Sequence, residues 1–373
     1  MLPYVLLIFV PLLFSFVAFS SSFTEYNGKW SLSLGKRREV IDHSAMLPVF
    51  FIILIILLSL RDVRIGNDTF NYKGYFDSYS RMSFSEVFFK ESDPLYWMLN
   101  WFVGQVTHNF QWLLTVVAFL TVIPIAKLYA EERQYGFLKL ILFVNMSTFI
   151  MLFSGLRQSL AISAGILAYG YVKKKKLFPF LVWALVALGF HHSGFMVFLM
   201  YPLYHMTLKK RHLWFVIPGL LLVFIFNQPI FLWATSTMTT LFGDKYDAEL
   251  QVSNSYTMII FFVMLLMLAY ILPDEKRMDR ETIGLRNFLI LVVILQFFAP
   301  VHTLAMRLNY YYIIFVPVLI PKVLKYARSV DLAGMANAIM SLFFFCYYLI
   351  SAYVACQGDG GALNTYPYVP FWK

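Results

Sequence analysis

Charged residues are scarce in this sequence, and their scarcity excludes an ordinary water-soluble fold. Asp, Glu, Lys and Arg make up only 13% of the 373 residues, whereas hydrophobic residues make up 60%. A soluble domain carries roughly a quarter charged residues. The apolar residues also form runs, such as 213–233 and 256–272, that approach the ~20 residues a helix needs to cross a bilayer. Because these runs do not alternate every second residue as barrel strands do, the sequence predicts an all-α polytopic membrane protein.

Cysteine is nearly absent, and acidic residues are outnumbered by basic ones. The two cysteines, Cys346 and Cys356, have no metal-ligand spacing, so we assign them no metal or redox role. The net charge of +10 is gathered in short connections beside the apolar runs. This is the positive-inside pattern of membrane proteins rather than a nucleic-acid patch, so we expect no nucleic-acid partner. The basic clusters lie within 29–38, 173–176, 209–211, 276–280 and 322–328.

We expect the basic clusters to be cytoplasmic, and about twelve transmembrane helices then alternate between the two faces. The first is interpreted as an uncleaved span rather than a signal peptide, because basic residues appear only after it. Segment 94–106 is only ~20 Å long as a helix, so we interpret it as a thirteenth, re-entrant or interfacial segment. The spans are predicted at 1–22, 46–60, 111–127, 137–154, 157–172, 177–193, 194–208, 213–233, 255–272, 284–301, 307–322 and 334–354.

The alternation predicts one transmembrane domain over residues 1–373, with periplasmic loops at about 61–110 and 234–254. The first of these loops opens with a pattern that suits phosphate and sugar. Arg61 and Arg64 offer guanidinium forks that match phosphate oxygens, and Asp68 and Tyr72 are residue types that commonly contact sugars. The alternative is that the two arginines only anchor a helix end at the lipid headgroups.

Three ionisable residues share one predicted depth in the membrane. Arg157, His191 and Arg307 each lie about 22–24 Å of helix rise from the nearest lysine cluster, against a hydrocarbon core of about 30 Å. Ionisable groups recessed below the outer surface are costly and normally face a cavity or one another. A common cavity is therefore predicted, although tilted or kinked helices would give the same arithmetic without one.

Polar and aromatic neighbours extend this predicted cavity. Gln158 follows Arg157, and Ser193 completes a His191-His192-Ser193 run at the end of a span. A lone histidine at a span end is commonly an interfacial hydrogen-bond partner, but two in tandem, level with two arginines, favour a function. Near Arg307, His302 and the Tyr310-Tyr311-Tyr312 run add to the lining.

Three motifs follow one another along the chain: Gly66-x-Asp68-Thr69-x-x-Tyr72, Arg157-Gln158 with Ala161, and His191-x-Ser193. In this order they resemble the Wzy/EpsG-type polysaccharide polymerases across residues ~1–330, most of the chain. Asn67 stands where threonine is common in that pattern, and Gly194 where alanine is common; neither departure touches an ionisable group. His191 matches the recurring histidine of the family, and His192 fills the variable place.

The resemblance implies a glycosyltransferase with a GT-C-like architecture in the bacterial inner (plasma) membrane. It would transfer a growing glycan from undecaprenyl pyrophosphate to a new lipid-linked repeat unit on the periplasmic face, in O-antigen or exopolysaccharide synthesis. Its implied partners are the undecaprenyl-pyrophosphate-linked oligosaccharide, membrane lipid and a chain-length regulator protein. We expect no cofactor, metal or nucleotide.

From the residues, we expect His191 or Asp68 to act as the base and Arg157 to stabilise the leaving pyrophosphate. The predicted substrate-binding residues are Arg61, Arg64, Tyr72, Gln158, Ser193, Arg307 and Tyr311.

Other functions remain open at this point. A lipid-oligosaccharide flippase or transporter would also place charges in a cavity, although many such folds carry inverted repeats and none is visible here. An O-antigen ligase shares the arginines and the periplasmic histidine. A membrane acyltransferase would use His191, and a rhomboid-like protease would use Ser193, which lacks the Gly-x-Ser-x-Gly setting of a nucleophile.

Overall fold

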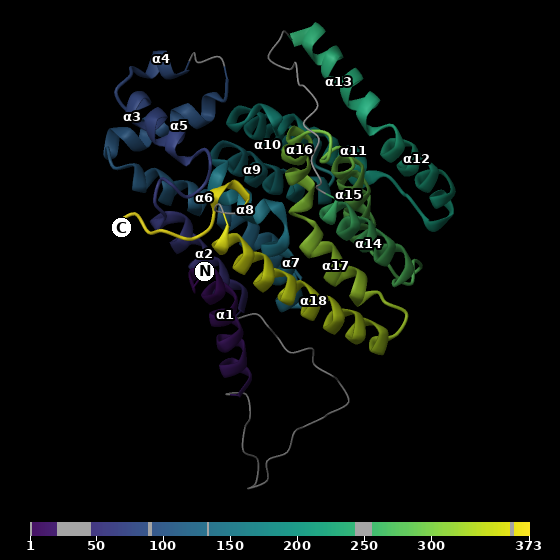
Figure 1. Ribbon diagram of the computed structural model, residues 1–373. Coiled ribbons are helices and arrows are strands. Elements are labelled where there is room, and N and C mark those ends of the chain that lie inside the picture. The colour runs from purple at the N-terminus through teal and green to yellow at the C-terminus, as the bar shows by residue number, and fades with distance from the viewer. Residues whose placement is uncertain (1, 21–45, 89–91, 133, 243–255, 359–361) are drawn as a thin grey trace. The chain divides into compact units, whose positions relative to one another are not determined.

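The computed structural model describes residues 2–20, 46–88, 92–132, 134–242, 256–358 and 362–373. Apart from two isolated bridges, the regular elements in those ranges are all helices, which confirms the all-α class (Figure 1). The basic residues at 29–38 lie outside the described ranges. The chain divides into two compact units, residues 1–195 with 334–373 and residues 196–333, and each is described by itself.

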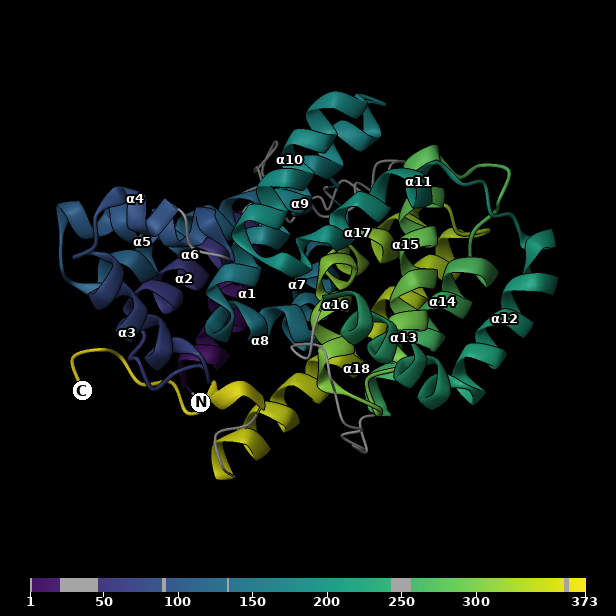
Figure 2. The same cartoon turned by 90° about the horizontal axis from the view of Figure 1, so that it is seen from above.

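The first unit is built around a hairpin of two helices, α9 and α10, which pack along one another (Figure 2). Helix α6 packs against α9 and against α2, and α5 packs against α10. The unit contains α1 (Leu2–Ser20), α2 (Met46–Leu60), α3 (Thr69–Tyr79), α4 (Phe84–Phe88), α5 (Pro94–Val106), α6 (Phe110–Ala130), α7 (Gly136–Asn145), α8 (Ser147–Ser154), α9 (Leu156–Lys173), α10 (Leu177–Phe190), most of α18 (Val330–Gln357) and the short η5 (Ala362–Asn364).

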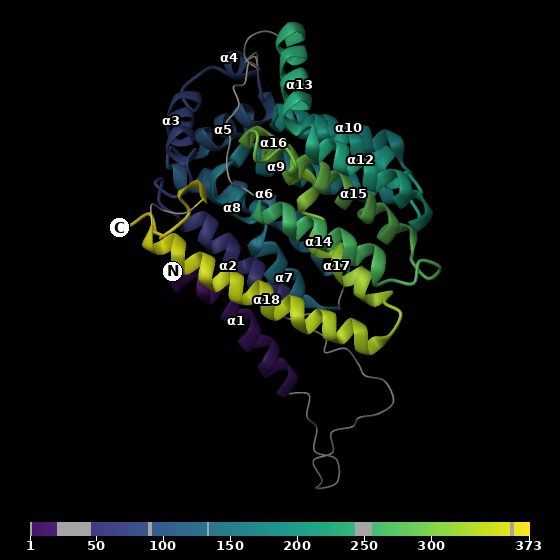
Figure 3. The ribbon, with the colours of Figure 1, turned by 45° about the vertical axis from the view of Figure 1, so that its right-hand side comes forward.

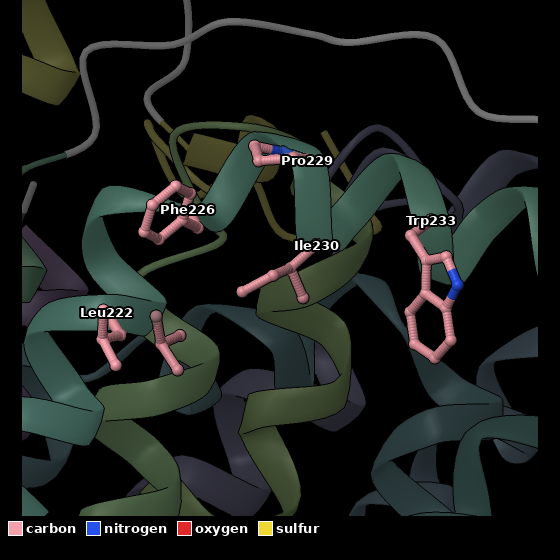
Figure 4. A pocket seen from close by; sticks show the side chains of 6 residues that line it. Leu222, Phe226, Pro229, Ile230 and Trp233 are labelled. Carbon is pink, nitrogen blue, oxygen red and sulfur yellow. The ribbon is translucent and has the colours of Figure 1, made fainter.

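The second unit has α15 at its centre, in contact with α11, α14, α16 and α17. Helices α12 and α13 meet at a bend of 76°. An apolar groove of about 480 Å³ lies at this bend and is lined by Leu222, Val223, Phe226, Pro229, Ile230 and Trp233 (Figure 4). The helices are α11 (Met200–His205), η3 (Lys210–His212), α12 (Leu213–Ile225), α13 (Asn227–Phe242), α14 (Thr257–Ile271), α15 (Arg280–Gln296), α16 (Thr303–Ile313) and α17 (Val316–Lys325), and η2 (His192–Leu199) precedes them.

Several predicted spans are broken or shorter in the structure. By length and composition, two described helices, α6 and α18, are sufficient to cross a membrane, and the number rises to five if each bent pair is one span. The bent pairs are α7 with α8, α12 with α13, and α16 with α17, and four further apolar helices are shorter. The count of twelve, the GT-C-like architecture and the single transmembrane domain therefore stay predictions.

The structure differs from the sequence-based expectation most clearly at 194–208 and in the first loop. Residues 194–208 form no single helix, because the 3-10 helix η2 is followed by only six residues of α11. The predicted loop 61–110 contains α3, α4 and the 13-residue α5, whose crossing of the membrane is not decided by its length. In the predicted loop 234–254, helix α13 continues to Phe242 and residues 243–255 lie outside the described ranges.

The C-terminal segment folds back across the end of α2 in the same unit (Figure 3). The amide of Phe371 donates to the carbonyl of Leu60 at 2.9 Å, and the amide of Asp62 donates to Val369 at 2.9 Å. The Tyr368 hydroxyl donates to the carbonyl of Leu57 at 2.9 Å. These bonds hold the start of the 61–68 turn, which leads into α3, against the body of the unit.

Gly66 makes the turn between α2 and α3 possible. Its φ is +91°, and a Cβ there would lie 2.0 Å from the carbonyl oxygen of Phe153 and 2.8 Å from Thr69 Oγ1. The Thr69 hydroxyl donates to the carbonyl of Ile65 at 2.7 Å and closes the turn. The Gly66–Thr69 part of the first motif therefore serves the backbone, and it sets where α3 begins beside the end of α8.

We predict that Gly66→Ala destabilises the protein, because the substitution adds both a backbone conformation that alanine disfavours and a clash with a main-chain oxygen. The cost is expected to exceed about 2 kcal/mol. Thermal unfolding of the detergent-purified protein measures it. Gly74→Ala is the matched control, since nothing lies within 4 Å of a Cβ there and alanine in a helix interior stabilises by about 0.5–1 kcal/mol. Equal melting temperatures for the two variants would contradict the prediction.

Candidate functional site

Arg157 and His191 lie at the same end of the α9–α10 hairpin. Helix α9 begins at Leu156 and α10 ends at Phe190, so the turn at 174–176 is at the other end of the hairpin. Both residues contact a single carboxylate, that of Asp93. Two of the three residues for which the sequence predicts one depth therefore meet at a carboxylate that no sequence motif indicates. Their depth in a membrane stays a prediction.

Asp93 is a buried acceptor that receives hydrogen bonds from both arms of the hairpin. Its Oδ2 atom accepts from Arg157 Nη1 at 2.7 Å and lies 3.4 Å from His191 Nδ1. Its Oδ1 atom accepts from the backbone amide of His192 at 2.9 Å. The Asp93 side chain is only 1% exposed. Three donors thus surround an anion that has almost no contact with solvent.

The local sequence around Asp93 does not indicate a role in the site. Asp93-Pro94 begins α5, and aspartate followed by proline is an ordinary helix start. In the structure the Asp93 side chain makes no capping hydrogen bond to α5 within the described residues, and its backbone is left-handed with φ 55° and ψ 48°. A non-glycine residue in this conformation is uncommon, although aspartate tolerates it better than most. The strained backbone and the absent cap together are the signal that marks this residue.

The donors outweigh the cost of burying the carboxylate. Burial alone would raise the pKa of Asp93, but the hydrogen bond from His191, the nearby His192 side chain and the charge of Arg157 hold that pKa well below its usual range. The predicted span 177–193 is shorter in the structure, where α10 ends at Phe190, so His191 follows the apolar helix instead of lying in it. Asp93 precedes α5, and both residues therefore lie outside the candidate spans. The carboxylate is therefore ionised throughout the range in which a histidine titrates.

His191 pairs with Asp93 in surroundings that disfavour its charged form. Burial lowers its pKa below the ordinary value of 6.5, His192 and Arg157 act in the same direction, and the hydrogen bond to Asp93 opposes them. Because an ionised carboxylate only accepts, the proton of that bond is on Nδ1, which leaves Nε2 as an acceptor. A carboxylate–imidazole pair of this kind fixes the tautomer and stabilises the ring when it takes up a proton.

Gly194 fixes the direction in which the chain leaves this site. Its amide donates to the carbonyl of His191 at 2.7 Å. A Cβ at this position would lie 2.4 Å from the carbonyl carbon and oxygen of Ala187 in the last turn of α10. The departure from the alanine that is common in the family pattern is therefore required by this backbone.

Arg157 is held between the carboxylate and two aromatic rings. Its guanidinium carbon lies 5.7 Å from the ring centre of Tyr72 and 5.4 Å from that of Trp97. The side chain remains 27% exposed, and its Nε atom is buried with no hydrogen-bond partner among the described residues. Only the exposed part of the Arg157 side chain is open to an anion in this structure. Tyr72, predicted to bind substrate, is 4% exposed and supports Arg157.

Asp93, His191 and His192 also offer metal-ligand atoms that lie within 4.8 Å of one another. Both carboxylate oxygens of Asp93, however, already accept hydrogen bonds, one of them from a guanidinium at 2.7 Å. A cation placed between these three residues would face the positive charge of Arg157 at short range. The arrangement favours an ion-pair and hydrogen-bond network over a metal centre.

Two predicted residues of the first loop lie apart from this network. Arg61 is 1% exposed, its Nη1 donates to the carbonyl of Leu58, and its Nε and Nη2 have no partner among the described residues. Arg64 is exposed and pairs with Asp62 at 2.6 Å. Their substrate contacts stay predictions, and the buried Arg61 has almost no surface to offer in this structure.

The remaining predicted residues are divided between the two units. In the first, Gln158 and Ser193 are 2% and 4% exposed, beside Arg157 and His192 in the chain. In the second, Tyr311 is fully buried, whereas Arg307 is exposed on α16. The membership of Arg307 and Tyr311 in the same cavity stays a prediction, as does the role of Asp68 as the base.

Comparison with known proteins gives one result that covers most of the chain. The sequence model of the EpsG family matches residues 44–369. This range contains the three motifs, and it also contains Asp93. No curated protein and no solved structure matches the chain. The extent of the family match is sufficient for assignment, and the protein belongs to the EpsG family, which confirms the resemblance to Wzy/EpsG-type polysaccharide polymerases.

Proposed function

We propose that the protein polymerises lipid-linked polysaccharide repeat units at the periplasmic face of the bacterial inner membrane. The growing glycan would pass from undecaprenyl pyrophosphate to a new undecaprenyl-pyrophosphate-linked repeat unit. Family membership supports a glycosyltransferase-like polymerase of polysaccharide synthesis. The observation that carries the finer proposal is the Asp93 network, because it joins a base and an anion-binding arginine at one carboxylate.

The geometry suits one displacement step. The oxygen of an acceptor hydroxyl attacks the anomeric carbon of the sugar that is attached to the donor pyrophosphate. The hydroxyl proton passes to His191 Nε2, and the imidazolium that forms is stabilised by Asp93. The bond from the anomeric carbon to the phosphate oxygen breaks, and its electron pair leaves with the pyrophosphate. Atoms and charge balance without a redox partner.

Arg157 would stabilise the leaving group as this bond breaks. Its Nη1 is engaged by Asp93 at 2.7 Å, so the guanidinium plane is fixed before substrate arrives, and the 27% of the side chain that is exposed would contact phosphate oxygens. A fixed donor of this kind costs no reorganisation during the reaction. We propose on this basis that the reaction is independent of metal and nucleotide.

An O-antigen ligase and a lipid-oligosaccharide transporter are the alternatives to this proposal. A ligase would use the same base and arginine on a different acceptor. A transporter would need the charges but not a histidine whose tautomer is fixed by a carboxylate. The Asp93–His191 pair therefore favours an enzyme over a transporter.

The proposal is tested by incubating the purified protein with the lipid-linked repeat unit in detergent. The reaction contains a chelator and no nucleotide. A ladder of lipid-linked oligomers on a gel is the expected product. Products with a single unit joined only to an added lipid A–core acceptor would identify a ligase. No glycan product, with lipid-linked substrate moved across vesicles that contain the protein, would identify a transporter. Activity that is lost with the chelator and restored by a divalent cation would overturn the metal independence.

Arg157→Ala is predicted to lower the polymerisation rate by at least about 100-fold, because it removes the donor for the leaving group. Arg157→Lys should restore only part of that loss, since an ammonium cannot bond Asp93 and phosphate with one rigid plane. Initial rates with the purified variants measure both effects. Arg81→Ala, an exposed arginine of the same unit, is the control for a lost charge, and it should remain active. A fully active Arg157→Ala would remove this residue from the site.

His191→Ala is predicted to be inactive and His192→Ala largely active. The backbone amide of His192 donates to Asp93 Oδ1, and an alanine keeps this amide. The His192 side chain lies 3.8 Å from Oδ1 and is 48% exposed. Polymer formed by complemented deletion cells, with protein levels checked on blots, distinguishes the two. The reverse outcome would show that His192 is the base, and activity in both variants would direct attention to Asp68.

The pH profile tests the pairing of Asp93 with His191. The neutral imidazole is the active form, and its pKa is lowered from 6.5, so kcat/KM should decline only on the acid side of that value. Asp93→Asn removes a carboxylate that raises the His191 pKa, so the acid limb should move to still lower pH while the plateau rate falls by about 100-fold or more. A lower plateau with an unmoved acid limb would show that Asp93 has a structural role only.

A further inference from the structure

Helix α3 presents an exposed polar and aromatic face. Asp68 and Tyr75 are seven positions apart, which is about two helical turns, and Asn71 lies between them on the same side. Asn71 and Tyr75 are exposed and Asp68 is partly exposed. Tyr75 keeps 42% of its surface open, whereas Tyr72 and Tyr79 of the same helix are 4% and 7% exposed.

Tyr75 is the exposed end of a chain of side-chain contacts that runs from Arg157 through Trp97. The guanidinium lies over Trp97, and Trp97 lies one helical turn after Asp93 in α5. The Tyr75 ring stands edge-on to Trp97, with centroids 5.3 Å apart. Trp97 is itself fixed by stacking on Tyr79 at 4.5 Å and 19°. These contacts fix the orientation of the Tyr75 ring and leave part of its surface open, two side chains away from the candidate chemistry.

An open aromatic ring with an amide one helical turn away and a carboxylate two turns away matches the surface of a short saccharide. One side of a pyranose ring presents C–H groups, which favour the electron-rich face of an aromatic ring. Its hydroxyls need donors and acceptors at the edge of the stack, and these are the groups that Asn71 and Asp68 supply. Ordered rings also add little conformational entropy cost on binding.

We propose that Asp68, Asn71 and Tyr75 form a saccharide subsite that binds a sugar of the lipid-linked repeat unit, with Tyr75 stacking on that sugar. The assignment rests on the proposed function, and it adds the residues that select the glycan rather than the lipid. Tyr75 and Asn71 are new to the site. Asp68 becomes a hydrogen-bond acceptor for sugar hydroxyls instead of the base.

The test is a binding measurement in which catalysis cannot occur. Full-length His191→Ala protein is titrated with the lipid-linked repeat unit from cells that lack this gene, and separately with sugar-free undecaprenyl pyrophosphate. Adding Tyr75→Ala should weaken binding of the sugar-bearing lipid about tenfold, as the loss of an aromatic stack does. Binding of the sugar-free lipid should change by less than about twofold. Tyr75→Phe should bind both lipids as the parent does, because the ring is retained.

Phe70→Ala is the matched control, since Phe70 is an aromatic residue of the same helix that is 70% exposed and about 140° around the helix from Tyr75. It should leave both affinities unchanged. Equal losses for the two lipids in Tyr75→Ala would show that the ring only supports the fold of the site, and no loss for either would show that it touches no sugar. Both results overturn the subsite.

The outcomes also separate this subsite from the polymerase proposal. If the selective loss is observed while the wild-type protein makes no polymer, the subsite stands and the polymerase assignment fails. If the wild-type protein makes polymer and Tyr75→Ala leaves the two affinities and the KM for the repeat unit unchanged, the polymerase stands and the subsite fails.

Discussion

A buried carboxylate stays ionised only when donors replace the water it has lost, and the site of this protein is arranged around that requirement at Asp93. The side chain is 1% exposed and receives its compensation from Arg157 at the start of α9 and from His191 and His192 after the end of α10. Removing one of these donors would leave an under-compensated charge, which is among the costliest local defects in a protein. The register of the α9–α10 hairpin and the start of α5 are thus tied to one anion.

The hairpin shows how much the sequence could predict. Apolar runs and lysine clusters placed α9 and α10 to within a few residues, and the constant rise of a helix was sufficient to bring Arg157 and His191 to one level. The bends were not predictable in the same way. Two helices that meet at 76° between 225 and 227 have the same continuous apolar composition as one straight span, because composition reports burial or lipid contact but not the direction of the next turn.

The role of Asp93 could not be predicted from the sequence, for a different reason. Its pairing with Arg157 crosses 64 positions, and helical periodicity carries no information about contacts between distant segments. Tyr72 illustrates the same limit on one helix: the motif identified it, but only the packing of α3 on α5 shows that Tyr72 is buried and Tyr75 is open. The motif includes Gly66, but it does not indicate that this position requires a backbone with φ +91°.

Local rules are broken at Asp93 in a way that favours function over stability. A left-handed aspartate that gives no capping bond to its own helix costs conformational energy and the benefit of the cap, and such costs concentrate at functional sites. The left-handed backbone directs the Asp93 carboxylate toward the α9–α10 hairpin instead of along α5. The buried Nε of Arg157, which has no partner among the described residues, is consistent with a site completed by a ligand.

Asp93, Arg157 and His191 would also couple the two halves of the proposed reaction. In the proposed reaction, a pyrophosphate bound to Arg157 would weaken the interaction of that guanidinium with Asp93, so more of the carboxylate's charge would act on His191. The incoming anion and the less neutralised Asp93 would both favour the protonated imidazole, and they would raise the His191 pKa at the moment when the acceptor proton is taken up. Before substrate binds, burial and Arg157 keep the same pKa low and the base unprotonated. A single buried carboxylate, shared between an arginine and a histidine, can thus link binding of the leaving group to activation of the nucleophile without any movement of the helices.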